Sequence, residues 1–164
     1  MVLNGDGLLL ASPIKNMVPN KRTEHGVSYG LAEVGYDIRL KQEVTFRPHE
    51  QTGRMHYRVG PLWKLGRFVI ASAIEEFNMP PDLVAIVHDK STWARRGLSV
   101  FNTVIEPGWR GFLTLELVYH GQGELHIPSG SGIAQVVFHE LAHHASYRGK
   151  YQDQADEPVD AILR

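Results

Sequence analysis

Short apolar runs, most of them bounded by glycine, proline, asparagine or aspartate, recur along this chain. Six runs are rich in β-branched and aromatic residues: residues 68–77, 83–88, 98–105, 112–119, 124–127 and 132–138. Such runs predict short strands joined by turns. Their spacing favours an all-β sandwich or barrel over a parallel α/β sheet. Helices are predicted in only two places, in the opening segment before Pro13 and at STWARR (91–96).

The chain is expected to fold as one domain over residues 1–164. This length is sufficient to bury a hydrophobic core, and no internal repeat, low-complexity tract or interdomain linker interrupts it. From roughly residue 150 onward the sequence is polar. Such a segment is expected to become ordered only around a ligand or a neighbouring subunit.

Composition narrows the classes of function. The net charge is −1 and no block of like charges occurs, so neither a nucleic-acid partner nor a membrane surface is predicted. No apolar stretch approaches the length of a membrane span. The absence of cysteine excludes disulfides, thiolate metal sites and the Cys-containing signature of zinc deaminases. It also fits a reducing compartment, so a cytoplasmic location is expected.

Glu116 stands out because it interrupts the apolar run FLTLELV (112–118). An ionised carboxylate inside a buried strand is costly unless it is paired or used for chemistry. Period-two alternation puts the three leucines of this run on one face and Glu116, with Thr114 and Val118, on the other. The pattern alone therefore leaves two interpretations, a functional buried carboxylate or an outward-facing surface residue.

A second polar group is predicted at the STWARR helix. Ser91, Thr92 and Arg95 fall at positions i, i+1 and i+4, which would gather two hydroxyls and a guanidinium at its N-terminal end. This arrangement suits an anion, although serine and threonine are also ordinary caps of solvated helices. Together with Glu116, the group suggests chemistry on a phosphorylated small molecule.

Five segments in the same order carry a family resemblance. KSTWARRGL (90–98), EPGWRGFLTLEL (106–117) and GIAQVVF (132–138) resemble the dCTP deaminase branch of the dCTP deaminase/dUTPase superfamily. SYGLAEVGYDIRL (28–40) is similar to the N-terminal segment of the family, and YRGKYQDQ (147–154) is similar to its C-terminal phosphate-binding segment. The resemblance implies a distorted jelly-roll-like β-barrel of the dUTPase-like type. It also implies a homotrimer with its sites between subunits.

The resemblance assigns roles to individual residues. Glu116 aligns with the general base, and Ser91 and Arg95 with residues that hold the catalytic water near the reacting base. Ten further residues would bind the substrate: Lys90, Thr92, Phe101, Asn102, Thr103, Val104, Trp109, Tyr147, Lys150 and Gln154. Lys90 and Thr92 would face the triphosphate, residues 101–104 and Trp109 would shape the nucleoside pocket, and a tail of about 147–164 would close over the phosphates.

The sequence departs from the family pattern in two places. Some members carry arginine at position 90, and the lysine found here lacks the bidentate guanidinium fork. The loop 101–104 also differs from the commoner versions, which affects the expected shape of the base pocket. Asp37 matches an aspartate of the family, and a structural role beside Arg39 is expected for it.

The implied reaction is hydrolysis of dCTP to dUTP and ammonia, which supplies dUMP for dTTP synthesis. No zinc is expected, and Mg²⁺ would be carried by the substrate phosphates. The alternatives are a bifunctional dCTP deaminase/dUTPase that yields dUMP, a deaminase of a modified cytosine deoxynucleotide, a dUTPase and a non-catalytic nucleotide-binding trimer. Against a pure dUTPase, Glu106 and Trp109 occupy turn positions where dUTPases carry Asp and Tyr.

Residues 139–143 read HELAH, a literal match to the HExxH zinc motif. That motif binds zinc only when it lies on a helix, which brings its two histidines onto one face. Here it directly follows the strand-like run 132–138. The sequence therefore predicts a strand end and a loop at this position.

Overall fold

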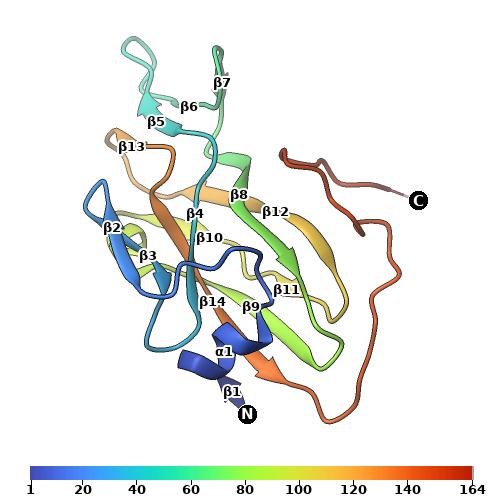
Figure 1. The fold of residues 1–164 in the computed structure, drawn as a ribbon. Coiled ribbons are helices and arrows are strands. Elements are labelled where there is room, and N and C mark those ends of the chain that lie inside the picture. Colours follow the sequence, from blue (N-terminus) through green and yellow to red (C-terminus); the bar gives the residue numbers. More distant parts are fainter. Residues whose placement is uncertain (164) are drawn as a thin grey trace.

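Strands dominate the computed structural model, which describes residues 1–163 (Figure 1). The two helices are α1 (Gly5–Ala11) and α2 (Ser91–Ala94). The strands are β1 (Val2–Leu3), β2 (Lys21–Glu24), β3 (Val27–Leu31), β4 (Tyr36–Arg39), β5 (Val44–Pro48), β6 (Met55–Arg58), β7 (Trp63–Leu65), β8 (Phe68–Asn78), β9 (Leu83–Asp89), β10 (Leu98–Val100), β11 (Val104–Ile105), β12 (Arg110–Tyr119), β13 (Leu125–Ile127) and β14 (Gly132–Glu140). Five of the six predicted strands and both predicted helices are confirmed, and the run 98–105 forms two short strands, β10 and β11.

The strands form three sheets. A seven-stranded sheet has the order β11-β9-β14-β4-β3-β2, with β1 pairing on β14. A three-stranded sheet has the order β10-β12-β8, and a four-stranded sheet the order β13-β5-β6-β7. The predicted run 98–105 divides between two of them, because β10 pairs with β12 whereas β11 pairs with β9. Residues 101–103 therefore cross from one sheet to the other.

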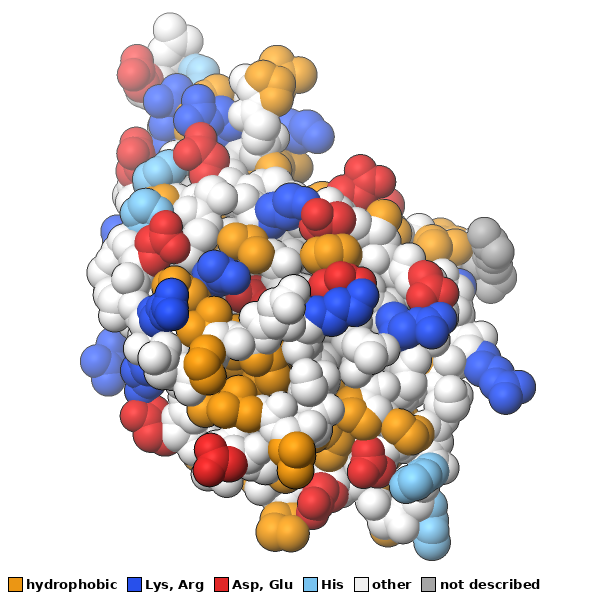
Figure 2. Space-filling model, in the orientation of Figure 1, with side chains coloured by type: hydrophobic (Ala, Val, Ile, Leu, Met, Phe, Trp, Pro, Cys, Tyr) orange, Lys and Arg blue, Asp and Glu red, His pale blue; other side chains and the backbone are white. Residues whose placement is uncertain are grey.

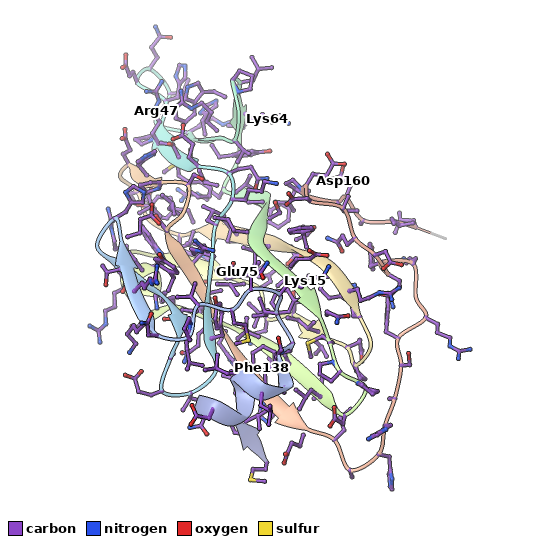
Figure 3. All side chains as sticks on the ribbon, viewed as in Figure 1. Lys15, Arg47, Lys64, Glu75, Phe138 and Asp160 are labelled. Atoms are coloured by element: carbon purple, nitrogen blue, oxygen red, sulfur yellow. The ribbon has the colours of Figure 1, made fainter. Side chains whose placement is uncertain are left out.

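The hydrophobic core takes buried side chains from all three sheets. β12 contributes its leucines at 113, 115 and 117, none more than 5% exposed, and Phe138 of β14 is fully buried. Figure 3 shows Phe138 near the α1 end of the molecule. This packing confirms the alternation read from the sequence for Leu115 and Leu117, which lie on the inner face of β12, whereas Leu113 lies at an irregularity of the β12–β8 ladder.

Strands β5, β6 and β7 form an arm that projects from one end of the molecule (Figure 1). Lys and Arg side chains gather on this arm in Figure 2. The guanidinium groups of Arg47 and Arg58 lie over the ring of Trp63, at 4.1 and 5.2 Å from its centroid. These contacts cover an aromatic ring that the arm would otherwise expose.

The polar C-terminal tail packs along β12 of its own chain. Gln154 pairs with Gly111 in a parallel bridge, and the Phe112 amide donates to the Gln154 carbonyl at 3.1 Å. An ion pair joins Arg110 to Asp153 at 2.9 Å. Arg164, the last residue of the predicted tail 147–164, lies outside the described residues. Within residues 1–163, no helix has the length and apolar character needed to cross a membrane.

Candidate active site

Glu116 lies on the outer face of β12, opposite Leu115 and Leu117 of the core. Its cross-strand partner on β8 is Ile70, and the side chain of Glu116 is half-buried. The side chain of Glu116 therefore points away from the core, which is one of the two interpretations left by the alternation. The outer face of β12 is nevertheless not open to solvent. Loop residues and the C-terminal tail cover it and leave a pocket.

The pocket over Glu116 has a volume of about 430 Å³. One wall comes from β8 and β12, another from residues 103–106, and the third from the tail. Its lining residues are Phe68, Ile70, Thr103, Val104, Ile105, Glu106, Trp109, Leu113, Thr114, Glu116, Tyr147, Tyr151, Gln154, Val159, Asp160 and Ala161. Figure 3 shows Asp160 on the tail near the β7 end of β8. A carboxylate on an apolar sheet face, with polar groups opposite, is typical of a site for acid–base chemistry.

Burial raises the pKa of Glu116 above its ordinary value of 4.5. A hydrogen bond from its own backbone and one from Thr103 oppose this shift, and Thr103 Oγ1 lies 3.5 Å from Glu116 Oε2. The apolar wall outweighs them because it removes water from the ionised carboxylate. A carboxyl group with a raised pKa can accept a proton from water and later return it to a leaving group.

Five of the ten residues predicted to bind substrate line this pocket with Glu116: Thr103, Val104, Trp109, Tyr147 and Gln154. Phe101 is adjacent but exposed, with its ring 6.2 Å from that of Phe68. Asn102 is exposed beside it. Lys150 lies in the tail, where its ammonium donates to the Ile162 carbonyl.

The α2 residues lie outside the pocket lining. Ser91, Thr92 and Arg95 are all exposed in this single chain. Lys90, at the start of α2, forms an ion pair with Asp37 of β4. Asp37 thus takes Lys90 as its partner, while Arg39 binds the carboxylate of Glu75 at 2.9 Å. One chain therefore does not bring Ser91 and Arg95 into the Glu116 pocket.

Hydrogen bonds hold the tail over the pocket. Trp109 Nε1 donates to the Tyr151 carbonyl at 2.6 Å, and the Tyr151 amide donates to the Tyr147 hydroxyl at 3.3 Å. The hydroxyl of Thr114, two residues before Glu116, accepts from Gln154 Nε2 and from the Val159 amide, the latter at 3.0 Å. The tail is therefore attached to the strand that carries Glu116.

The HELAH segment lies at a strand end, as predicted. His139 and Glu140 are the last two residues of β14, and the carboxylate of Glu140 lies 3.8 Å from the N-terminal ammonium. The Leu141 amide then donates to the Asp82 carbonyl at 2.8 Å. Because the segment is not helical, the helical geometry of an HExxH zinc site is not present. Residues 1–163 contain no group of three or more His, Cys, Asp or Glu side chains arranged to hold a metal.

Several lining residues were not identified from the sequence. Tyr151, Val159 and Asp160 come from the polar tail, where no periodicity indicated which side chains face the pocket. Phe68 and Ile70 could have been identified from the sequence, because β8 carries apolar residues on both faces. A strand that is apolar on both faces is expected to be covered on both.

Comparison with known proteins agrees with the predicted fold and family. The family model for dCTP deaminase-like proteins matches residues 15–141. The chain is 33% identical over 156 residues to the dCTP deaminase of Campylobacter fetus subsp. fetus (strain 82-40), covering 84% of this chain and 83% of that protein.

Two solved structures show the same fold. The 2'-deoxycytidine 5'-triphosphate deaminase from Agrobacterium tumefaciens has a TM-score of 0.59 and 18% identity, covering 87% of this chain and 48% of that chain. The native EIAV dUTPase has a TM-score of 0.51 and 16% identity, covering 88% of this chain and 94% of that chain. The predicted dUTPase-like β fold is thereby confirmed.

Proposed function

Because the chain belongs to the dCTP deaminase-like family, we propose that it hydrolyses dCTP to dUTP and ammonia, with Glu116 as the catalytic base. The observation that carries this proposal is the position of Glu116, a half-buried carboxylate with a raised pKa at the wall of a 430 Å³ pocket. We infer the identity of the substrate from relatives that are 33% identical to this chain and are named dCTP deaminases.

The reaction requires a water molecule to attack C4 of the cytosine. Glu116 accepts a proton from this water as the bond to C4 forms, and the tetrahedral intermediate then loses the 4-amino group as ammonia. Glu116 returns the proton to the departing nitrogen, so the carboxylate ends each cycle ionised. Ser91 and Arg95 hold the water and stabilise the charge that develops on the ring.

The tail and the α2 region bind the remainder of the nucleotide. Cationic and hydrogen-bonding groups for the phosphates come from Lys90, Thr92, Tyr147, Lys150 and Gln154. Mg²⁺ enters bound to the triphosphate as part of the substrate, since the phosphate oxygens are the hard ligands that it prefers. Residues 101–104 and Trp109 shape the space for the base and sugar.

We further propose a homotrimer in which each site combines two subunits. The exposed positions of Ser91 and Arg95, outside the pocket that contains Glu116, support this arrangement. A neighbouring subunit would supply the α2 residues to each Glu116 pocket. A free deoxynucleotide as substrate supports a cytoplasmic location and a role in dUMP and dTTP supply.

A single assay tests the reaction. Purified protein is incubated with dCTP and Mg²⁺, and dCTP, dUTP and dUMP are separated by chromatography. Accumulation of dUTP supports a deaminase, whereas direct formation of dUMP supports the bifunctional alternative. Conversion of dUTP without conversion of dCTP would identify a dUTPase and refute the proposal. Preferential turnover of a 5-substituted dCTP would identify a deaminase of modified cytosine nucleotides.

A further inference from the structure

The arm formed by β5, β6 and β7 concentrates positive charge. Residues 43–67 contain four arginines and one lysine but only two acidic residues, Glu43 and Glu50, whereas the whole chain has a net charge of −1. Figure 3 shows Arg47 and Lys64 on this arm. None of residues 43–67 lines the pocket around Glu116. The arm therefore carries cationic groups that the proposed reaction does not use.

Strand register places these groups on one face of the arm. Arg47 lies opposite His56, and Arg58 lies opposite Trp63. Because side chains alternate between the two faces of a strand, these four residues share one face. Phe46, on the other face of β5, is fully buried in the core. The face that carries Arg47 and Arg58 is therefore the one turned away from the core.

A cavity of about 390 Å³ opens on this outer face. Its lining residues are Arg47, His49, Glu50, Gln51, His56 and Trp63. The volume is close to the 430 Å³ of the pocket around Glu116. It also falls within the range of about 300–1,000 Å³ that is typical of small-molecule sites. The cavity is therefore large enough for a small molecule and not only for a single ion.

Trp63 positions the guanidinium of Arg47 at the wall of this cavity. The central carbon of the guanidinium lies over the indole ring, 4.1 Å from its centroid. Such stacking uses the flat face of the guanidinium and leaves its in-plane N–H donors free. Arg58 is paired with Glu43 at 3.8 Å, whereas Arg47 forms none of the ion pairs found among residues 1–163. A planar fork of free donors is suited to a phosphate group.

Two imidazoles add hydrogen-bonding groups to the cavity. The rings of His49 and His56 lie 5.2 Å apart. His56 Nδ1 donates to the Arg54 carbonyl at 3.0 Å, which leaves Nε2 as the ring nitrogen that can bind a ligand. The Gln51 amide donates to His49 Nδ1 at 3.3 Å, so the hydrogen of the His49 ring is on Nε2 and can be donated to an anion. An anion held by Arg47 would therefore find further partners within the same cavity.

We propose that this cavity is a binding site for a phosphorylated small molecule of nucleotide size, separate from the pocket around Glu116. Arg47 binds the phosphate through its guanidinium fork, and His49 donates a further hydrogen bond. Glu50 and Gln51 accept hydrogen bonds from hydroxyl groups of the ligand. Because the carboxylate of Glu50 repels a second negative charge, it directs the neutral part of the ligand to its own side of the cavity.

A titration followed by NMR tests the site directly. Isotope-labelled wild-type protein is titrated with inorganic phosphate, pyrophosphate and AMP at constant ionic strength. The Gln51 amide and the Trp63 indole report on the arm, and the Val159 amide reports on the pocket around Glu116. We expect saturable shifts at Gln51 and Trp63, with AMP binding more tightly than inorganic phosphate. Equal affinities for these two probes would identify free phosphate as the ligand and refute a site of nucleotide size.

Three variants separate specific binding from general charge. Arg47→Met should weaken AMP binding by about tenfold, because it removes charge-assisted hydrogen bonds. Glu50→Gln should strengthen it by about two- to fivefold, because a repulsive charge is lost. Lys64→Met is the matched control, since Lys64 lies on the opposite face of β7 from Trp63 and carries the same charge as Arg47. It should change the dissociation constant by less than about twofold.

Three results would overturn the inference. The first is the absence of saturable shifts at Gln51 and Trp63 with all three probes. The second is equal weakening by Arg47→Met and Lys64→Met, which would reduce the effect to net charge. The third is a changed oligomeric state of Arg47→Met in native mass spectrometry, which would show that a neighbouring subunit covers this face. Binding is measured without turnover, so the outcome does not depend on whether the protein deaminates dCTP.

Discussion

Ile70 of β8 lies directly across the β12–β8 ladder from Glu116, and both side chains line the same pocket. Burial raises the pKa of Glu116, and the branched apolar side chain of Ile70 is part of the pocket wall beside it. The other ionisable groups that line the pocket are Glu106, Tyr147, Tyr151 and Asp160. The pKa of Glu116 is therefore expected to respond to changes at position 70.

Ile70→Thr should move the acid limb of the kcat/KM–pH profile to lower pH. The hydroxyl brings polarity to the wall, stabilises the ionised carboxylate and lowers its pKa toward 4.5. The profile is measured with dCTP in both proteins. Ile74→Thr, on the same strand but outside the pocket lining, is the control and should leave the limb in place. An unmoved limb in Ile70→Thr would show that Ile70 does not set this pKa.

Glu116→Gln should abolish deamination while preserving nucleotide binding. The amide has nearly the same shape but cannot accept the proton of the attacking water, and loss of a general base costs about 10²–10⁴-fold in rate. Single-turnover assays with dCTP and a binding titration provide the measurement. Turnover within about tenfold of wild type would remove Glu116 from the proposed role.

The same substitution should change stability in a pH-dependent way. Because the pKa of Glu116 is raised in the folded state, the folded protein binds its proton more tightly than the unfolded chain does. Stability therefore falls as the pH rises from 4.5 through the raised folded value. Glu116→Gln removes this penalty, so its melting temperature should exceed that of wild type at neutral pH. The difference should shrink as the pH approaches 4.5, and a constant difference across pH would contradict this account.

Thr114→Val tests the attachment of the tail. The substitution keeps the shape of the side chain but removes the oxygen that accepts hydrogen bonds from Gln154 and Val159. Each lost bond is worth about 1 kcal/mol, so the Val159 amide should exchange its hydrogen about fivefold faster, and the KM for dCTP should rise. Thr23→Val, at an exposed position of β2, serves as the control. Unchanged exchange at Val159 would mean that Thr114 does not retain the tail.

The histidines of HELAH should be dispensable for activity. His139 is the last but one residue of β14 and His143 lies in the following loop, so the two do not share a helical face. We expect His139→Ala and His143→Ala to retain deamination. A zinc-selective chelator should leave activity intact, whereas chelation of Mg²⁺ should reduce it. Stoichiometric zinc in the active protein, found by elemental analysis, would overturn the zinc-independent mechanism.

The sequence predicted the sheet faces but not the contacts between distant segments. Alternation placed Leu115 inside and Glu116 outside correctly, because a strand has period two regardless of its neighbours. The pairing of Lys90 with Asp37 could not be read in this way, since 53 residues separate the two. The hydrogen bond from the Val159 amide to Thr114 could not be predicted either. A polar tail has no periodicity that indicates which of its backbone groups form hydrogen bonds with the rest of the protein.

Two inactive variants should restore activity when they share a trimer. Each proposed site combines the α2 residues of one subunit with the Glu116 of its neighbour. In mixed trimers of Ser91→Ala/Arg95→Ala and Glu116→Gln, roughly one quarter of the interfaces should therefore hold a complete set of wild-type groups. The variants are dissociated together, reassembled and assayed with dCTP, and each variant reassembled alone provides the inactive baseline.

Absence of rescue, in a sample whose mixed trimers are confirmed by native mass spectrometry, would place all three catalytic groups on one chain. The tail and α2 would then have to rearrange within a single subunit, because the pocket around Glu116 includes neither Ser91 nor Arg95.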